Sequence, residues 1–328
     1  MATKKTILSG MRPTGKLHLG HLVGALENWV ALQHEYSNYH LIADYHALTT
    51  NPDTSGLYQN SIEMLIDWLA AGLDPTKSPM FRQSQIKEHT ELHLIFSMLI
   101  TQARLERNPA VKEQVRDLNI ESVSYGHLGY PVLQAADILL YKGEYVPVGE
   151  DQVPHVEITR EIARRFNALY GKVFPEPEPK LTTFARLPGL DGMDKKMSKS
   201  AGNTILLSDP PEEIQRKMRT AVTDPLKVRK NDPGRPEICL VFTYHKKFNG
   251  AEVPQIEADC RSGALGCVEC KARIAARIAE ALEPLRERRA YYETHPDEVK
   301  DILADGEQRA RAKAQATMIE VREAMKLG

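Results

Sequence analysis

The chain has 328 residues, which at roughly 100 to 200 residues per domain suggests two domains. Its 43 Lys and Arg residues against 44 Asp and Glu give a formal charge of −1. That balance excludes a histone-like basic protein and an acidic solvating tail, although it leaves room for a local nucleic-acid-binding patch. No apolar run is long enough to span a membrane or to act as a secretory signal, so we expect a cytoplasmic protein with no membrane contact.

The first part of the chain alternates between short apolar runs and amphipathic helical patterns. The predicted elements are a strand at Thr6–Gly10, a helix over 22–32, a strand at Tyr39–Ala43, a helix over 56–71 and a strand from Met80. This order is half of a doubly wound parallel sheet, the Rossmann-like α/β arrangement. Ligands bind beyond the carboxyl ends of such strands, where Gly10–Gly15 and Asp44–His46 would lie.

The remaining sequence predicts a helical insertion and an all-helical C-terminal region. Further predicted segments are helices within 86–145, a return strand at Val146–Gly149, a helix over 154–169 and a loop or linker around Pro175, Pro177 and Pro179. From residue 209 onward no strand is predicted. We therefore expect a Rossmann-like domain at 1–205 and a helical domain at 206–328, whose last helix could pack back on the first domain.

His18-Leu19-Gly20-His21 follows the first predicted strand, at the start of the next helix. Free N–H groups at a helix start attract anions, and Gly20 allows a ligand to approach the backbone. Two imidazoles can donate hydrogen bonds to phosphate oxygens. The alternative is a pair of surface histidines at a helix start.

Lys196-Met197-Ser198-Lys199-Ser200 lies between Gly192 and Gly202, in a segment predicted to be a mobile loop over about 192–202. Two lysines on such a loop can stabilise the charge that develops on a leaving pyrophosphate. The alternative is a solvated basic loop, but so specific a string favours a functional motif.

The two motifs together resemble the signature pair of class I aminoacyl-tRNA synthetases. Other strings resemble the bacterial-type tryptophanyl branch of this family: Ser9–Gly15, Tyr130-Pro131, Ala135–Leu139, Val146–Gln152 and Ala221–Asp224. The resemblance implies a homodimeric ligase that uses ATP and Mg²⁺ to convert L-tryptophan into tryptophanyl-adenylate and pyrophosphate. It then transfers tryptophan to tRNA(Trp). Residues 1–205 would be the catalytic domain and residues 206–328 the anticodon-binding domain.

The resemblance also implies site residues. ATP would be bound by Arg12, Pro13, Thr14, Gly20, His21, Gly149, Glu150, Asp151, Leu187, Lys196, Met197, Ser198, Lys199 and Ser200. Within that set, the catalytic roles fall to Lys196, Lys199 and His21. Tryptophan would be bound by Asp137, Tyr130, Gln134, His46, Gln152 and Leu8, with Asp137 accepting the indole N–H and Tyr130 holding the ammonium group. Gln134 and Arg12 replace a Met and a Gln that many relatives carry.

All four cysteines, Cys239, Cys260, Cys267 and Cys270, lie in the predicted helical domain. Only Cys267 and Cys270 form a Cys-x-x-Cys pair, whereas zinc ribbons normally have two such pairs. One close pair with two separate thiolates equally suits a four-iron–four-sulfur (4Fe-4S) cluster. The resemblance favours the cluster, because a subset of tryptophanyl enzymes carries one; zinc and four unconnected thiols are the alternatives.

Two weaker patterns favour ordinary surfaces. His89 and His93 are four residues apart on a predicted helix and are expected to be a surface pair rather than metal ligands. A basic cluster could contact tRNA phosphates, but such runs are more often solvated faces. Its members are Arg216, Lys217, Arg219, Lys227, Arg229 and Lys230.

Three other functions remain open at this point. A tyrosyl-tRNA synthetase shares the fold and an aspartate in the amino-acid pocket. A small-molecule nucleotidylyltransferase also carries HxGH, but lacks the lysine loop and the helical C-terminal region. A non-enzymatic metal-cluster RNA-binding protein would leave both motifs unexplained.

Overall fold

The computed structural model describes residues 4–117, 119–181 and 187–327. The chain forms two compact units, each assembled from separate stretches. Unit 1 comprises Met1–Gly15, Glu27–Thr183 and His295–Gly328, and unit 2 comprises Lys16–Leu26 and Phe184–Thr294. The units therefore do not follow the chain segments 1–205 and 206–328, which remain a proposal about function.

Unit 1 is built on a five-stranded parallel sheet with the strand order β3-β2-β1-β4-β5. The strands are β1 (Thr6–Met11), β2 (Ser37–Ile42), β3 (Met80–Arg82), β4 (Tyr145–Val148) and β5 (Glu178–Leu181). Ile7 of β1 pairs with Asn38 on one side and Tyr145 on the other. This is the predicted doubly wound arrangement, and the strand order reverses between β1 and β4.

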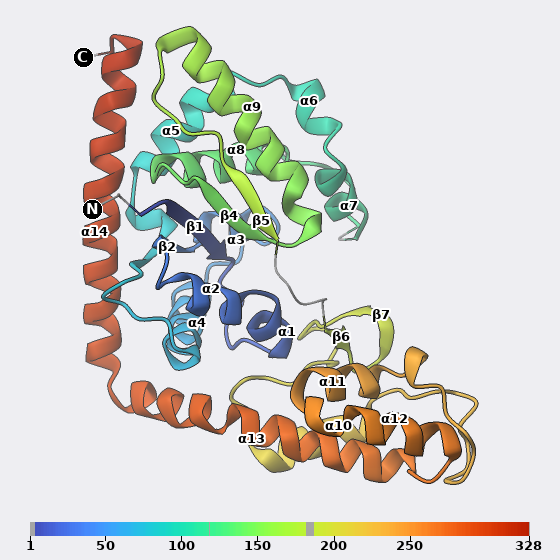
Figure 1. Cartoon of the computed structure of the whole chain (residues 1–328). Helices are drawn as coiled ribbons and strands as arrows, with labels where there is room; N and C mark the ends of the chain where they lie inside the picture. The colour runs from blue at the N-terminus through green and yellow to red at the C-terminus, as the bar shows by residue number, and fades with distance from the viewer. Residues whose placement is uncertain (1–3, 118, 182–186, 328) are drawn as a thin grey trace. The chain divides into compact units, whose positions relative to one another are not determined.

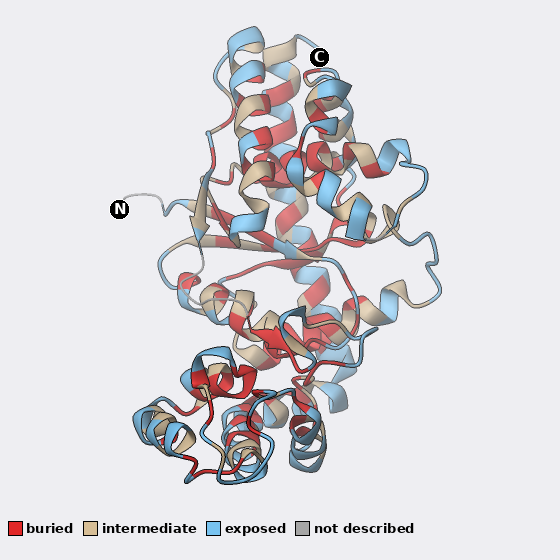
Figure 2. Cartoon of the chain, turned by 90° about the vertical axis from the view of Figure 1, so that its right-hand side faces the viewer, coloured by how far each residue is buried: buried red, intermediate tan, exposed pale blue. Residues whose placement is uncertain are grey.

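Helices cover the sheet, and their apolar stripes form the core of unit 1 (Figures 1 and 2). They are α2 (Glu27–Leu32), α3 (Asp44–Leu48), α4 (Leu57–Ala71), α5 (Glu88–Ser97), α6 (Gln102–Glu106), α7 (Pro109–Asp117), α8 (Tyr125–Leu140), α9 (Val153–Tyr170) and α14 (Pro296–Met325), with short 3-10 turns at Gln83–Gln85 and Glu150–Gln152. The insertion over 86–145 is helical, as predicted. Gly72 ends α4 with a φ of 109°, a left-handed conformation that glycine adopts easily.

The C-terminal helix α14 belongs to unit 1, although it is the last element of the chain. In Figure 1 it runs along the side of the unit. Its Gly306 lies against the backbone of β3, where a Cβ atom would clash with the Met80 carbonyl oxygen. Arg82 at the end of β3 pairs with Glu307 at 2.7 Å. A glycine therefore permits the close packing that attaches this helix to the sheet.

The predicted loop around the three prolines is wrong at its C-terminal end, because Glu178–Leu181 forms strand β5. Pro179 pairs in register with Val146 of β4. A proline cannot donate to a neighbouring strand, but β5 is an edge strand and can accommodate it where the missing N–H would face outward. The proline pattern is therefore compatible with a strand at the sheet edge.

Unit 2 is mainly helical and carries one small hairpin. Its elements are α1 (Leu19–His21), the π-helical turn η1 (Leu22–Leu26), β6 (Pro188–Gly189), β7 (Gly192–Lys196), α10 (Pro211–Thr220), α11 (Leu240–Phe248), α12 (Val253–Ser262) and α13 (Cys267–Thr294), with 3-10 turns at Pro236–Ile238 and Gly250–Glu252. Ile274, Ile278 and Leu282 of α13 are buried and lie at helical spacing, so one face of this helix packs into the unit. No strand lies within residues 209–327, as predicted.

The predicted single helix over 22–32 is a composite: α1 and η1 precede α2. Gly24 and Ala25 lie in the π-helical turn, and the 3.6-residue periodicity gives no sign of this irregularity. In the described part of the chain, no helix is long and apolar enough to cross a membrane.

Candidate nucleotide and amino-acid sites

The carboxyl edge of the sheet places two predicted segments at the switch point of unit 1. Arg12–Thr14 follows β1, and Gly149–Asp151 follows the adjacent strand β4. A nucleotide binds at such a switch point in doubly wound sheets. Arg12 is exposed, and its Nη1 lies 3.4 Å from Oγ1 of Thr50.

Gly149 is constrained by the side chain of Asp151. A Cβ atom at Gly149 would lie 2.7 Å from Asp151 Oδ1, and Asp151 Oδ2 accepts a hydrogen bond from Gln152 Nε2 at 2.9 Å. Glu150 and Asp151 are exposed, whereas Gln152 is half-buried. Glycine at position 149 therefore avoids a steric clash with the Asp151 carboxylate.

A buried carboxylate, Asp137 of α8, is the centre of a polar network in unit 1. Gln83 Nε2 donates to Oδ1 at 2.8 Å and to Oδ2 at 2.9 Å, and His46 Nε2 donates to Oδ2 at 2.8 Å. Nδ1 of His89 lies 2.7 Å from Oδ1. A carboxylate only accepts hydrogen bonds when ionised, so donors on all sides favour the charged form.

The pKa of Asp137 lies below its ordinary value. Burial alone would raise this pKa, but the positive charges and hydrogen bonds of His89 and His46 outweigh burial. Asp137 is 2% exposed and remains an ionised acceptor in the interior. A buried, ionised acceptor selects a ligand that presents a hydrogen-bond donor.

Tyr130 lies in the same helix as Asp137, α8, and its hydroxyl group contacts a histidine. Its hydroxyl lies 3.0 Å from Nε2 of His155, whose Nδ1 lies 3.2 Å from the Asn108 amide. Burial raises the pKa of Tyr130 to about 12 and lowers the pKa of His155 to about 4. Both groups are therefore neutral at neutral pH. The rings of His46 and Tyr130 are 6.4 Å apart, so these two predicted residues lie near each other.

Three further predicted binding residues, two for tryptophan and one for ATP, differ in how far they are buried. Leu8 of β1 is 4% exposed and belongs to the hydrophobic core. Gln134 of α8 is half-buried. Leu187, assigned to the adenine, is 2% exposed and lies in unit 2 just before β6.

In unit 2, His18 and His21 form a closed cap at the start of α1. The Gly20 backbone N–H donates to His18 Nδ1 at 3.1 Å, and the His18 backbone N–H donates to His21 Nδ1 at 3.2 Å. The two rings are 3.8 Å apart. Both Nδ1 atoms are acceptors, so in each neutral ring Nε2 carries the proton.

Burial keeps these two rings neutral. It lowers the pKa of His18 to about 4 and that of His21 to about 3, with the charge of Lys199 lowering both further. Each ring therefore offers an Nε2–H donor rather than a positive charge. Such donors suit phosphate oxygens without competing electrostatically with a lysine.

The lysine motif lies against the histidine motif within unit 2. Lys199 Nζ donates to the Lys16 carbonyl at 2.9 Å, and a Cβ atom at Gly20 would lie 3.3 Å from the sulfur of Met197. Lys196 ends strand β7, and Ser198 and Ser200 share a hydrogen bond of 2.7 Å between their hydroxyls. The structure thus brings the two motifs together.

Asn203 holds this lysine segment and was missed by sequence reasoning. Its Oδ1 accepts from the Ser198 backbone at 2.8 Å, and its Nδ2 donates to the Lys196 carbonyl at 2.9 Å and to Asp191 at 2.7 Å. Asn203 is 4% exposed. A lone Asn after Gly202 resembles any turn residue, so the sequence offered no signal for this role.

The prediction that His89 and His93 form a surface pair is wrong. His89 is fully buried, with Nε2 2.9 Å from the Tyr141 hydroxyl and Nδ1 beside Asp137. His93 is half-buried. Gln83, also fully buried, was missed as well. The sequence signal that could have indicated His89 and Gln83 is Asp137 itself. A buried aspartate needs hydrogen-bond donors, and these can come from elements distant in sequence.

The four cysteines all lie in unit 2, on neighbouring helices. Cys239 caps α11, Cys260 lies in α12, and Cys267 and Cys270 lie in the first turn of α13. Burial raises the pKa of Cys270 to about 12, and each of the other three thiols raises it further. The four thiols therefore lie within electrostatic reach of one another.

No group of three or more His, Cys, Asp or Glu side chains is arranged to hold a metal ion in the part of the chain that the structure describes. A single zinc ion with bonds of about 2.3 Å needs four sulfurs nearly in contact. A four-iron cluster is larger, so its thiolates are further apart.

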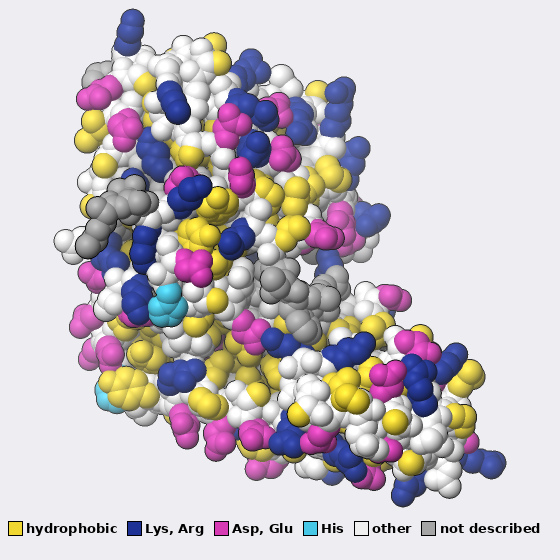
Figure 3. Space-filling model, in the orientation of Figure 1, with side chains coloured by type: hydrophobic (Ala, Val, Ile, Leu, Met, Phe, Trp, Pro, Cys, Tyr) yellow, Lys and Arg dark blue, Asp and Glu magenta, His cyan; other side chains and the backbone are white. Residues whose placement is uncertain are grey.

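The positive charges of the predicted basic cluster are partly neutralised by acidic side chains of unit 2. Lys217 pairs with Asp209 at 2.7 Å, Arg216 pairs with Glu213 at 2.6 Å, and Lys227 is buried and donates to the Asp232 carbonyl. Over the face in Figure 3, Lys and Arg alternate with Asp and Glu. Arg219, Arg229 and Lys230 remain exposed.

Comparison with known proteins places these features in a family. The family described as tRNA synthetases class I (W and Y) matches residues 2–283. A tryptophan–tRNA ligase from Thermotoga maritima is 50% identical over 326 residues, covering 98% of this chain and 99% of that protein. One from Aquifex aeolicus is 46% identical, with coverage of 98% and 99%. The crystal structure of tryptophanyl-tRNA synthetase from Campylobacter jejuni complexed with ADP and tryptophan has a TM-score of 0.87 at 34% identity, covering 98% of this chain and 99% of that chain.

Proposed function

The chain belongs to the class I tRNA synthetases of the tryptophan and tyrosine group, and from this premise we propose that it joins L-tryptophan to tRNA(Trp). It is an aminoacyl-tRNA ligase. ATP and tryptophan react to tryptophanyl-adenylate and pyrophosphate, and the acyl group then passes to the terminal ribose of the tRNA.

The buried carboxylate of Asp137 is the group that recognises the indole ring of tryptophan. The indole nitrogen is only a hydrogen-bond donor, and Asp137 is only an acceptor. Both carboxylate oxygens already have two close nitrogen neighbours each. The side chain of His46 is 12% exposed, whereas Gln83 and His89 are fully buried. His46 is therefore the donor that gives way, and the indole N–H replaces it at Oδ2.

The amino-acid end of tryptophan is held by neutral polar groups. The Tyr130 hydroxyl, neutral because burial raises its pKa to about 12, accepts from the ammonium group. Gln152 and Gln134 line the same pocket together with Leu8.

The residues assigned to ATP come from separate stretches of the chain, and each group is described within its own unit. In unit 1 these are Arg12–Thr14 and Gly149–Asp151, at the ends of β1 and β4. In unit 2, His21 donates to phosphate oxygens and Gly20 allows the nucleotide to approach the backbone. Leu187 contacts the adenine, and the segment 196–200 receives the β- and γ-phosphates. Mg²⁺ bound to the nucleotide would balance the charge of its phosphates.

The chemistry needs positioning and charge stabilisation rather than a protein nucleophile. The tryptophan carboxylate attacks the α-phosphorus, the bond from that phosphorus to the bridging oxygen breaks, and pyrophosphate leaves. Lys196 and Lys199 neutralise the charge that builds on the pyrophosphate. Neutral His21 adds an N–H donor, and Asn203 holds the lysine segment in place.

Charging of a tRNA(Trp) transcript tests the complete reaction. The protein should attach labelled tryptophan to this tRNA in the presence of ATP and Mg²⁺, and a tRNA(Tyr) transcript is the matched control. Charging of tRNA(Tyr) with tyrosine instead would assign the chain to the other branch of the family.

We also propose that Cys239, Cys260, Cys267 and Cys270 hold a 4Fe-4S cluster, with zinc as the alternative. The four thiols lie near one another on α11, α12 and α13. Backbone N–H groups of Val241 and Phe242 approach the Cys239 thiol, as suits a thiolate ligand. Four thiolates supply the ligand set that such a cluster requires, and the cluster would link three helices of unit 2.

A homodimer and a cytoplasmic location complete the proposal. Three large apolar side chains of the helical insertion are exposed: Leu94 at 58%, Met98 at 69% and Tyr125 at 74%. A second copy that covers them would bury apolar area. Leu94→Asp should yield monomers in light scattering, whereas Leu169→Asp, at an exposed leucine of α9, should not.

Residues 206–328 would recognise the anticodon.

A further inference from the structure

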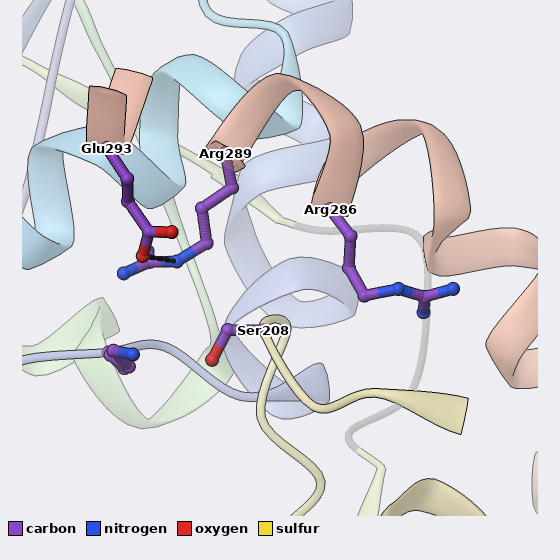
Figure 4. A pocket seen from close by; sticks show the side chains of 5 residues that line it. Ser208, Arg286, Arg289 and Glu293 are labelled. Carbon is purple, nitrogen blue, oxygen red and sulfur yellow. Dashed lines mark ion pairs between the residues drawn. The ribbon is translucent and has the colours of Figure 1, made fainter. Parts of the chain in front are cut away.

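A cavity of about 150 Å³ lies in unit 2, apart from the residues assigned to ATP and tryptophan. It is lined by Lys16, Ser208, Arg286, Arg289 and Glu293, all from unit 2. The last three lie on one side of α13 at spacings of three and four residues (Figure 4). Helical spacing therefore brings them to the same wall.

The charges in the cavity do not cancel. Arg289 is 2% exposed, and its Nε lies 3.1 Å from Glu293 Oε1, so these two neutralise each other. Figure 4 shows Arg289 turned toward Glu293, while Arg286 extends away from that pair. Lys16 and Arg286 have no carboxylate partner among the described residues, so the lining has two surplus positive charges.

Arg286 has a hydrogen-bonding group that the protein leaves unused. Its Nη2 donates to the Ala279 carbonyl at 3.0 Å. Its Nη1 is buried and has no hydrogen-bond partner among the described residues. A buried guanidinium N–H without an acceptor is costly, and an anion in the cavity would supply that acceptor.

We propose that this cavity binds a phosphate group, supplied either by the tRNA backbone or by a free phosphate anion. Lys16, Arg286 and the Ser208 hydroxyl donate to its oxygens, and the Arg289–Glu293 pair holds the wall. Arginine is suited to phosphate because its planar fork presents parallel N–H groups. Two surplus charges match a phosphate group better than a neutral ligand or a cation.

The cavity also has a backbone connection to the lysine motif. The Lys16 carbonyl accepts the hydrogen bond from Lys199 Nζ, while the side chain of Lys16 lines the cavity. A phosphate in the cavity would therefore fix the residue on which Lys199 rests in this structure. The tRNA source rests on the proposed function, whereas binding of free phosphate does not.

The test combines two measurements on the full chain and on Arg286→Gln. Sodium phosphate should raise the thermal midpoint of wild type more than sodium chloride of equal ionic strength, and the variant should lose that difference. If the phosphate belongs to tRNA, the dissociation constant for tRNA(Trp) should rise about tenfold in the variant. The slope of log affinity against log salt should also fall by about one.

Controls separate this inference from folding and from the proposed function. Arg273→Gln, on the same helix but outside the cavity, should behave as wild type, and Arg286→Lys should retain part of the phosphate effect. Loss of the phosphate effect with unchanged tRNA affinity would identify a site for a free anion. If Arg286→Gln keeps both properties, the inference is overturned. Failure of the proposed function is seen separately, as a wild-type protein that does not drive tryptophan-dependent ATP–pyrophosphate exchange.

Discussion

Nδ1 of His89 lies 2.7 Å from Oδ1 of Asp137, and both side chains are buried. The histidine comes from α5 and the aspartate from α8, two helices of the insertion that follows β3. Tyr141 holds the other ring nitrogen of His89. This contact keeps Asp137 ionised in the interior, and the proposed recognition of indole depends on that charge.

Replacing His89 should therefore weaken tryptophan binding. In His89→Leu, burial is no longer opposed by this histidine, so the pKa of Asp137 rises. The KM for tryptophan should rise at least tenfold and should increase further as the pH falls, while the KM for ATP changes little. Steady-state ATP–pyrophosphate exchange between pH 5.5 and 8 measures this.

His89→Gln is the conservative comparison, since an amide can still donate to Asp137. It should recover most of the affinity for tryptophan. Equal loss in both variants, with no pH dependence, would mean that His89 acts only by filling space.

Lys199→Ala should reduce adenylate formation about a hundredfold while leaving tryptophan binding nearly unchanged. The lysine lies beside the histidine motif, where its charge affects both His18 and His21. Pyrophosphate exchange measures the first quantity and calorimetric titration with tryptophan the second. Lys195→Ala, at the exposed neighbour outside the motif, is the control. Unchanged turnover in Lys199→Ala would exclude the assigned role.

The fully buried His40 should make unit 1 less stable in acid. It stacks on Trp29 with ring centroids 4.7 Å apart, and burial lowers its pKa to about 3. Below pH 6.5 the unfolded chain gains a proton that the folded chain does not. Stability is therefore lost as the pH falls, by about 1.4 kcal/mol per pH unit, until the pH reaches the folded pKa.

His40→Phe should remove that share of the pH dependence, whatever its effect at neutral pH. Urea unfolding at pH 7.5, 5.5 and 4.5 gives the slope. His34→Phe, at an exposed histidine, should leave the slope unchanged. The same slope in His40→Phe and wild type would contradict the role of His40.

The cysteine site makes a prediction with a visible result. Protein purified without oxygen should be brown, with a broad absorbance near roughly 400 nm, about four irons per chain and matching sulfide. Cys270→Ser should remove the colour. Stoichiometric zinc in a colourless anaerobic preparation, with no iron or sulfide, would instead identify a zinc site.

The sheet, the insertion and both phosphate motifs could be predicted from the sequence, because apolar periodicity and short motifs are local signals. Strand β5 could not, since prolines within a strand are tolerated only at an edge and the edge is a property of the assembled sheet. The partners of Asp137 were also hidden: Gln83, His89 and His46 converge from three elements. A local pattern cannot show which distant donors meet a buried carboxylate.

The cavity by α13 was hidden for a similar reason. Arg286, Arg289 and Glu293 form an ordinary charged helical stretch in sequence, and only folding adds Lys16 and Ser208. The stretch 16–26 also joins unit 2 although unit 1 flanks it on both sides in the chain. A division of the chain into consecutive domains cannot show that a short internal stretch belongs to the other unit.

The most direct test of the central claim is amino-acid-dependent ATP–pyrophosphate exchange, with tryptophan and tyrosine compared at equal concentration. The proposed function predicts exchange with tryptophan at least a hundredfold faster than with tyrosine, because the bicyclic indole and the smaller phenol hold their donors at different distances from the amino-acid end, and only one of them can meet a fixed Asp137. Equal or faster exchange with tyrosine, or no exchange with either amino acid, would contradict it.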